Sequence, residues 1–116
     1  MAQITLDNMS LLNRCANGGL TRTSLDISQD YLGLVTRNLQ SAIASRDAGL
    51  ALDFVGELID LASSLFAYMF VDKAKQLEDA LSEDDWPAVK LNLNSLMGLA
   101  DELEMAIEVF KEEEMY

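Results

Sequence analysis

Apolar residues recur at helical spacing along most of the chain, which predicts amphipathic helices joined by short turns. The first long helix is expected to begin at Thr23 or Ser24, either of which is a good N-cap, and to run to about Ser45. One apolar stripe on it comprises Leu32, Val35, Leu39, Ala42 and Ile43. A second stripe comprises Ile27, Tyr31 and Leu34.

The segment after residues 45–49 contains no helix breaker before Pro87. It carries two parallel heptad rows, one of Ala51, Phe54, Leu58, Leu61, Leu65 and Tyr68, the other of Leu52, Val55, Ile59, Ala62, Phe66 and Met69. Two adjacent rows make a wide apolar face, which suits a helix packed against more than one neighbour. We therefore expect one unusually long helix of about 30 residues, reaching Leu81. A kink near residues 71–73 is an open alternative.

The most regular pattern begins at Trp86, within a helix-start signal at residues 82–87. Capping side chains come first, and Pro87 follows in the first turn, where its missing N–H costs nothing. Eight apolar residues are then spaced alternately by three and four: Trp86, Val89, Leu93, Leu96, Ala100, Leu103, Ile107 and Phe110. This 3.5-residue repeat predicts the seam of a left-handed helix bundle.

The apolar pattern of residues 39–65 recurs in residues 77–103. An ungapped alignment of the two segments, shifted by 38 residues, places Asp47 on Asp85. Each part reads as a helix, a tight acidic turn and a second helix. The match indicates either a two-copy hairpin repeat, as in peptide-binding solenoids, or the likeness of any two amphipathic hairpins with equal turns. Because a solenoid needs about three repeats for stability, we favour a closed bundle.

Composition supports an all-α fold with an aliphatic core, since half of the 116 residues are hydrophobic, 7% are aromatic and there is one proline. The expected architecture is an antiparallel four-helix-type bundle of two helical hairpins. Residues 1–22 are expected to form an N-terminal segment, as a short helix over about Asp7 to Ala16 or as a lid. The bundle domain is expected at residues 23–112, followed by an acidic tail at residues 113–116.

The chain is strongly acidic, with a formal net charge of −12. Residues 1–71 carry 7 acidic and 4 basic groups, whereas residues 72–116 carry 13 acidic and 4 basic groups. The scattered basic residues argue against binding nucleic acid through its phosphates. The acidity indicates a soluble, self-repelling surface, or a phage-type inhibitor that imitates a polyanion and blocks a protein that binds DNA or RNA.

No recognisable catalytic centre is present, chiefly because the chain has no histidine. That absence removes Ser-His-Asp and Cys-His catalysis and the usual zinc and di-iron sites. Cys15 is the only cysteine and has no base partner. The carboxylate pairs Glu57/Asp60 and Asp101/Glu104 are typical of solvated helix faces. We expect no enzymatic activity, no metal and no cofactor.

The candidate partner-binding residues are Leu65, Phe66, Tyr68, Met69 and Phe70, with Trp86. The run from residue 65 to residue 71 is apolar on all sides of a helix. It indicates either a helix buried on every side or an apolar groove that accepts a partner helix. Trp86 is interpreted as a plug at the end of the bundle or as a binding hot spot.

Three short motifs occur in the order found in the flagellin export chaperone family: Ala42-Ile43-Ala44-Ser45-Arg46-Asp47, Leu65-Phe66-Ala67-Tyr68-Met69 and Ala80-Leu81-Ser82-Glu83-Asp84. Thr23-Ser24-Leu25, before the first long helix, is also similar to that family. On these motifs, the chain resembles the family over residues 23–107. The resemblance implies a cytosolic bundle that wraps a helical segment of an export substrate and delays its polymerisation. It also implies a groove that includes Tyr68 and Met69, with residues 1–20 as a lid.

The expected function is therefore that of a non-enzymatic chaperone or adaptor that holds a helical segment of a partner protein. The alternatives are the polyanion mimic and a homo-oligomer, such as a homodimer, that shares the seam at residues 93–110 between copies. A cytoplasmic location is expected, because the N-terminus lacks a secretory signal. The most apolar stretch also carries Asp53, Glu57 and Asp60, so we expect no membrane span.

Overall fold

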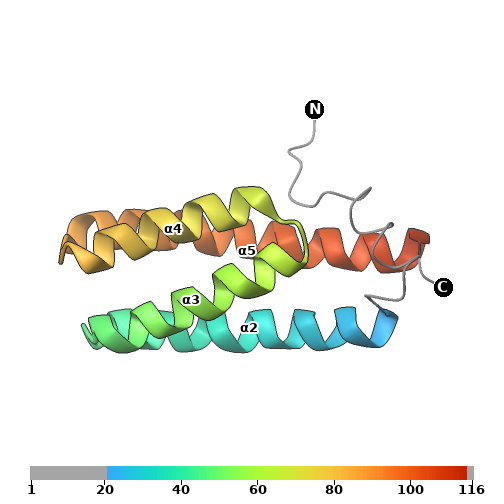
Figure 1. Ribbon diagram of the computed structural model, residues 1–116, viewed down its shortest axis with the longest axis horizontal. Helices are drawn as coiled ribbons and strands as arrows, with labels where there is room; N and C mark the ends of the chain where they lie inside the picture. Colours follow the sequence, from blue (N-terminus) through green and yellow to red (C-terminus); the bar gives the residue numbers. More distant parts are fainter. Residues whose placement is uncertain (1–20, 115–116) are drawn as a thin grey trace.

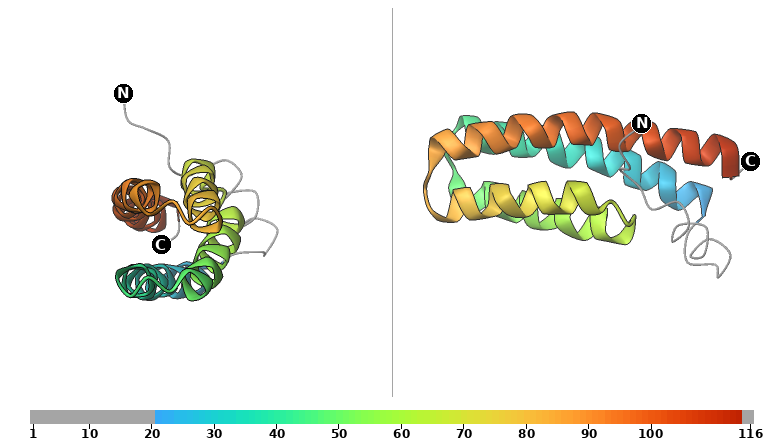
Figure 2. Two further views of the ribbon diagram at one scale, coloured as in Figure 1. Left: turned by 90° about the vertical axis from the view of Figure 1, so that its left-hand side faces the viewer. Right: turned by 90° about the horizontal axis from the view of Figure 1, so that it is seen from above.

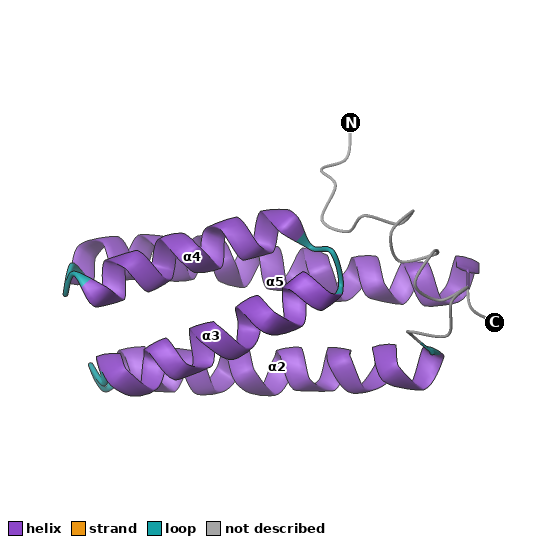
Figure 3. Cartoon of the chain, viewed as in Figure 1, coloured by secondary structure: helices purple, strands orange, loops and turns teal. Residues whose placement is uncertain are grey.

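The computed structural model describes residues 21–114, and these form four α-helices joined by three tight turns (Figure 1). The helices are α2 (Arg22–Ala44), α3 (Ala48–Ser64), α4 (Tyr68–Ser82) and α5 (Trp86–Glu114). No strand occurs within the described residues (Figure 3). The all-α prediction is confirmed. The predicted short helix at residues 7–16 lies outside the described residues.

The helices form a closed antiparallel bundle, because each one packs against the next along the chain and α5 returns to α2. Seen end-on, they surround a common centre in the order α2, α3, α4, α5 (Figure 2). The longest helices, α2 with 23 residues and α5 with 29, extend beyond the α3–α4 turn (Figure 1). The predicted bundle of two helical hairpins, α2–α3 and α4–α5, is confirmed.

The prediction of one continuous helix from residue 50 to residue 81 is wrong, because the chain turns sharply at residues 65–67. Phe66 adopts the left-handed conformation with a φ of 58°. The Ala67 N–H then donates to the Ala62 carbonyl at 2.9 Å, which closes the end of α3. The turn contains neither glycine nor proline, and Ala67 provides no side-chain cap for α4. None of the usual stop signals marks this position in the sequence.

All three turns between the helices have the same geometry. Arg46, Phe66 and Asp84 each have a φ of 58°. In each turn the next N–H donates to a carbonyl five residues earlier: Asp47 to Ala42 at 2.9 Å, Ala67 to Ala62 at 2.9 Å, and Asp85 to Ala80 at 3.0 Å. The shift of 38 residues that places Asp47 on Asp85 therefore superposes two equivalent turns.

The bundle core is aliphatic and is completed by two phenylalanines, Phe70 and Phe110. The predicted seam of α5 is confirmed: Val89, Leu96, Ala100, Leu103, Ile107 and Phe110 are buried, and Trp86 and Leu93 are partly buried. All five members of the first stripe of α2 are buried as well. Its second stripe, Ile27, Tyr31 and Leu34, remains exposed at 63%, 38% and 47%.

Helix α2 begins earlier than expected, with Thr21 rather than Thr23 or Ser24 as its N-cap. The Thr21 side chain accepts a hydrogen bond from the backbone N–H of Ser24 at 3.1 Å. At the other turns, Asp47 caps α3 and the Asp85 carboxylate accepts from the Ala88 N–H. Within residues 21–114, no helix combines the length and apolar character that crossing a bilayer requires.

Candidate functional site

The residues predicted around the α3–α4 turn divide into core and surface. Leu65 and Phe70 are core residues, with 0% and 2% of their surface exposed. Tyr68 is 55% exposed, and Phe66 and Met69 are partly buried. The rings of Phe66 and Tyr68 meet edge-on with their centroids 6.4 Å apart. Only Phe66, Tyr68 and Met69 are placed where a partner could contact them in the folded bundle.

Trp86, the sixth predicted residue, lies at the opposite end of the bundle from Tyr68 and its neighbours. Its indole Nε1 donates to the Asp84 carboxylate at 2.7 Å. The guanidinium carbon of Arg46 lies 4.9 Å from the centre of the indole ring, which is cation–π geometry. Trp86 therefore ties the α2–α3 turn to the α4–α5 turn, and its side chain is occupied by contacts within the chain.

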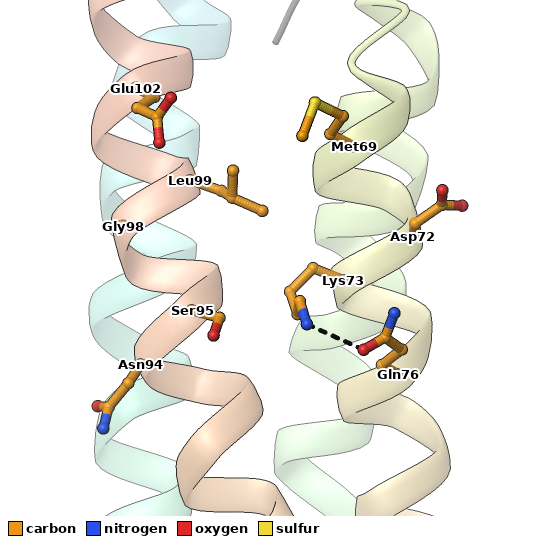
Figure 4. Close-up of a pocket in the computed structure, with 9 residues that line it drawn as sticks. All are labelled: Met69, Asp72, Lys73, Gln76, Asn94, Ser95, Gly98, Leu99 and Glu102. Atoms are coloured by element: carbon orange, nitrogen blue, oxygen red, sulfur yellow. Dashed lines mark hydrogen bonds between the residues drawn. The ribbon is translucent and has the colours of Figure 1, made fainter. Parts of the chain in front are cut away.

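A groove of about 460 Å³ runs between α4 and α5 (Figure 4). It is lined by Met69, Asp72, Lys73, Gln76, Asn94, Ser95, Gly98, Leu99 and Glu102. Met69 and Leu99 point toward each other from opposite walls (Figure 4). The Lys73 ammonium donates to the Gln76 side-chain oxygen at 2.9 Å. Because only Met69 and Leu99 are large and apolar, this groove offers little surface to an apolar ligand.

The more apolar surface lies on the outside of α2 and α3, and we call it the α2–α3 face: Ile27, Tyr31, Leu34, Leu50 and Phe54. The three α2 residues follow one another at helical spacing, and Leu50 on α3 is 44% exposed. Toward the α2–α3 turn, a hollow of about 220 Å³ between the two helices includes Leu50 and Phe54 in its lining. Both helices thus contribute apolar side chains to one open surface.

An acidic row borders the α2–α3 face. Helix α3 carries Asp53, Glu57 and Asp60 and no basic residue. The Tyr31 hydroxyl donates a hydrogen bond to the Glu57 carboxylate, which joins α2 to α3 across the face. This hydrogen bond raises the pKa of Tyr31 above its ordinary value, with smaller contributions from desolvation and the negative charge. The face therefore combines apolar side chains with an edge of negative charge.

A polar cluster joins the N-terminal part of α2 to the C-terminal part of α5. At its centre is Lys111, which is buried, with 5% of its surface exposed. The Lys111 ammonium contacts the Asp26 carboxylate and lies 3.3 Å from a Glu108 oxygen. The Gln29 amide donates to Glu108 and to the Glu104 carbonyl, both at 3.2 Å. The hydrogen bond with Asp26 is the main cause that raises the pKa of Lys111. These contacts fasten α5 to α2.

Glu108 should make this cluster sensitive to acid, because its pKa is lowered first by the Gln29 hydrogen bond and then by Lys111. A carboxyl group whose pKa is lowered by folding stabilises the fold at pH values above its ordinary pKa of 4.5. That contribution is lost as the pH falls through the lower folded-state pKa. We expect wild type to have a higher Tm than Glu108→Gln at neutral pH, and the difference to shrink as the pH falls below 4.5.

Thermal unfolding of both proteins across this pH range, followed by circular dichroism, measures the effect. Glu112→Gln provides a matched control, because Glu112 is exposed on the same helix. A Tm difference for Glu108→Gln that stays constant with pH would contradict the assignment.

No three Cys, Asp or Glu side chains within residues 21–114 converge to hold a metal ion. Comparison with known proteins gives no match to a family model, to a characterised protein or to a solved structure. The resemblance to flagellin export chaperones therefore stays a prediction, and the surfaces of the bundle carry the functional argument.

Proposed function

We propose that this protein is a non-enzymatic chaperone or adaptor that binds an amphipathic helix of a partner protein on the α2–α3 face. The observation that carries the proposal is the exposed stripe of Ile27, Tyr31 and Leu34 beside Leu50 and Phe54. Exposed apolar residues that gather on one face are typical of a protein-interaction surface, whereas scattered ones need no explanation. The cytoplasm is the proposed setting.

A helix suits this face because the exposed stripe of α2 runs beside the antiparallel helix α3, and a shallow groove opens between the two helices at Leu50 and Phe54, near their turn. The exposed side chains of α2 recur at i, i+4 and i+7, which is the ridge spacing that a packed helix matches. A partner helix with apolar residues at the same spacing would cover Ile27, Tyr31 and Leu34 from above, with Leu50 and Phe54 on its other side. This is the helix-in-groove mode of peptide recognition.

The partner helix is proposed to carry basic residues along its edge. Asp53, Glu57 and Asp60 border the groove on α3, and the whole chain has a net charge of −12. Such a charge accelerates the approach of a cationic segment and disfavours an acidic one. Apolar contacts would supply affinity, and the acidic row would orient the helix in the groove.

The test uses a labelled synthetic peptide of about 18 residues, or five helical turns, with leucines on one face and lysines on the other. We expect Leu34→Ser to raise its Kd about tenfold, since burying a leucine contributes about 1.5–3 kcal/mol and about 1.4 kcal/mol is tenfold. Fluorescence anisotropy gives the Kd. Serine leaves the charge unchanged, and the same peptide with glutamates for lysines tests the acidic row.

Leu91→Ser is the matched control, because Leu91 is 72% exposed on α5, away from the α2–α3 face. It should leave the Kd unchanged. Tyr68→Ser tests the site predicted from the sequence at the α3–α4 turn. Equal Kd values for wild type and Leu34→Ser would overturn the assignment to the α2–α3 face.

A polyanion mimic is the second candidate function, favoured by the 13 acidic and 4 basic residues in residues 72–116. Binding by charge alone weakens steeply with salt. Peptide binding that is lost at high salt and is indifferent to Leu34→Ser would support the mimic. Binding that persists in salt and depends on Leu34 would support the helix-binding chaperone.

A further inference from the structure

Helices α2 and α5 project past the α3–α4 turn at one end of the bundle (Figure 1). Helix α5 has 29 residues and its neighbour α4 has 15, whereas α2 has 23 and its neighbour α3 has 17. At about 1.5 Å per residue, α5 exceeds α4 by about 20 Å. Arg22 at the start of α2 donates to the Lys111 carbonyl near the end of α5 at 3.2 Å. The two projecting parts therefore lie side by side, beyond the end of α3 and α4.

Three apolar side chains on these projecting parts are buried, although neither α3 nor α4 extends beside them. Leu25 in the first turn of α2 is 0% exposed, and Ile107 and Phe110 near the end of α5 are 1% and 2% exposed. A fully buried side chain touches about 6–12 other residues. Two helices that lie side by side bury only the row of side chains between them and leave both flanks of that row open. A further part of the chain therefore covers these three residues.

The three turns between the helices share one geometry, but the α3–α4 turn differs from the other two in its exposure. Every residue of the α2–α3 and α4–α5 turns, 45–47 and 83–85, is exposed. In the α3–α4 turn, by contrast, Leu65 and Ala67 are each 0% exposed. Equal backbone geometry directs equivalent side chains the same way, so the difference comes from what lies over the turn. The cover stops short of Tyr68, which is 55% exposed.

We propose that residues 1–20 pack across this end of the bundle and complete its core between α2 and α5. They join α2 at its N-cap, Thr21, and so begin at the covered end. Residues 115–116, which follow α5, are too few to bury three side chains. Twenty residues reach about 60 Å when extended, which is ample for a projection of about 20 Å. The segment also supplies apolar side chains for such a core: Ile4, Leu6, Met9, Leu11 and Leu12.

Charge favours this occupant over a second copy of the chain. Residues 1–20 carry one acidic residue, Asp7, and one basic residue, Arg14, so their side chains have no net charge. The end of α5 is acidic, with Glu104, Glu112 and Glu113 exposed. A neutral segment approaches this end without repulsion, whereas a second copy brings a net charge of −12. Covalent attachment also keeps the segment at a high effective concentration beside the surface.

The full chain carrying both Leu11→Ser and Leu12→Ser tests whether the segment completes the core. Loss of the two apolar side chains should uncover Leu25 and Phe110. We expect the Tm to fall by at least about 4 °C and the binding of a hydrophobic dye to the folded protein to rise severalfold. Asn13→Ser is the matched control at a neighbouring polar position and should change neither. Circular dichroism and dye fluorescence measure the two effects, and wild-type values for the double variant would overturn the proposal.

A nitroxide spin label at residue 8 tests where the segment lies, in the full chain with Asn8→Cys and Cys15→Ser. We expect it to broaden the amide NMR signals of Ala67 and Phe110 and to leave that of Trp86, at the opposite end of the bundle, unchanged. A mixture of spin-labelled chains with isotope-enriched chains that lack the spin label should show no broadening, because the contact lies within one chain. Broadening in the mixture would assign the cover to a second copy, and unbroadened signals of Ala67 and Phe110 in both samples would place the segment elsewhere. Either result would overturn the proposal, which does not depend on peptide binding by the α2–α3 face.

Discussion

Phe70→Ala is expected to lower the free energy of unfolding by about 3–5 kcal/mol, the cost of truncating a buried phenylalanine. Phe70 is 2% exposed and is one of the largest fully buried side chains of the bundle. Removing the ring leaves a cavity that the packed helices fill only in part. Urea denaturation followed by circular dichroism measures the change.

Tyr68→Ala is the matched control for Phe70→Ala. Tyr68 lies two residues earlier in α4 and is 55% exposed, so its loss should cost no more than about 1 kcal/mol. The two aromatic residues belong to the same predicted binding run, and this pair of variants separates core from surface within it. Similar losses for both would contradict the placement of Phe70 in the core.

The free energy of unfolding of Phe66→Gly is expected to exceed that of Phe66→Ala by about 1–2 kcal/mol. This difference is the cost of left-handed backbone for a residue with a Cβ. Both substitutions remove the ring of Phe66 and its edge contact with Tyr68. The difference between the two variants therefore reports the backbone alone, at a φ of 58°. Urea denaturation of Phe66→Gly and Phe66→Ala gives it directly.

Asp53 provides the control position, because it is exposed within helix α3. There the order should reverse, with Asp53→Ala more stable than Asp53→Gly by about 1 kcal/mol. If Phe66→Ala proved more stable than Phe66→Gly, with an increase in helix content, α3 and α4 would be joining into the single helix that the sequence pattern favours.

The seam of α5 could be predicted from the sequence because a strict 3.5-residue repeat has one physical explanation, a stripe buried against neighbouring helices. The start of α5 was equally clear, since Asp85 and Pro87 are both typical of a helix N-terminus. The turn at Phe66 could not be predicted in this way. Its geometry is imposed by packing of the helices on either side, and Phe66 is a poor choice for left-handed backbone.

The candidate surfaces were harder to predict, because periodicity shows that a stripe is apolar and does not show whether the stripe is buried. The two stripes of α2 look alike in the sequence, yet the bundle covers Leu32 and Leu39 and leaves Ile27 and Leu34 exposed. Burial depends on how many neighbours a helix has, and each helix here has two. The same limit applies to Lys111, whose burial against Asp26 depends on a contact across the fold.

The cyclic order of the helices has a consequence for folding. Three of the four helix pairs are joined by three-residue turns, so those pairs form with little loss of chain entropy. The pairing of α5 with α2 joins residues as far apart as Arg22 and Lys111, 89 positions along the chain. Closing that loop is the entropically costly step, and long-range contacts of this kind slow folding. We therefore expect the α2–α5 edge to be the last helix pair to form as the bundle folds.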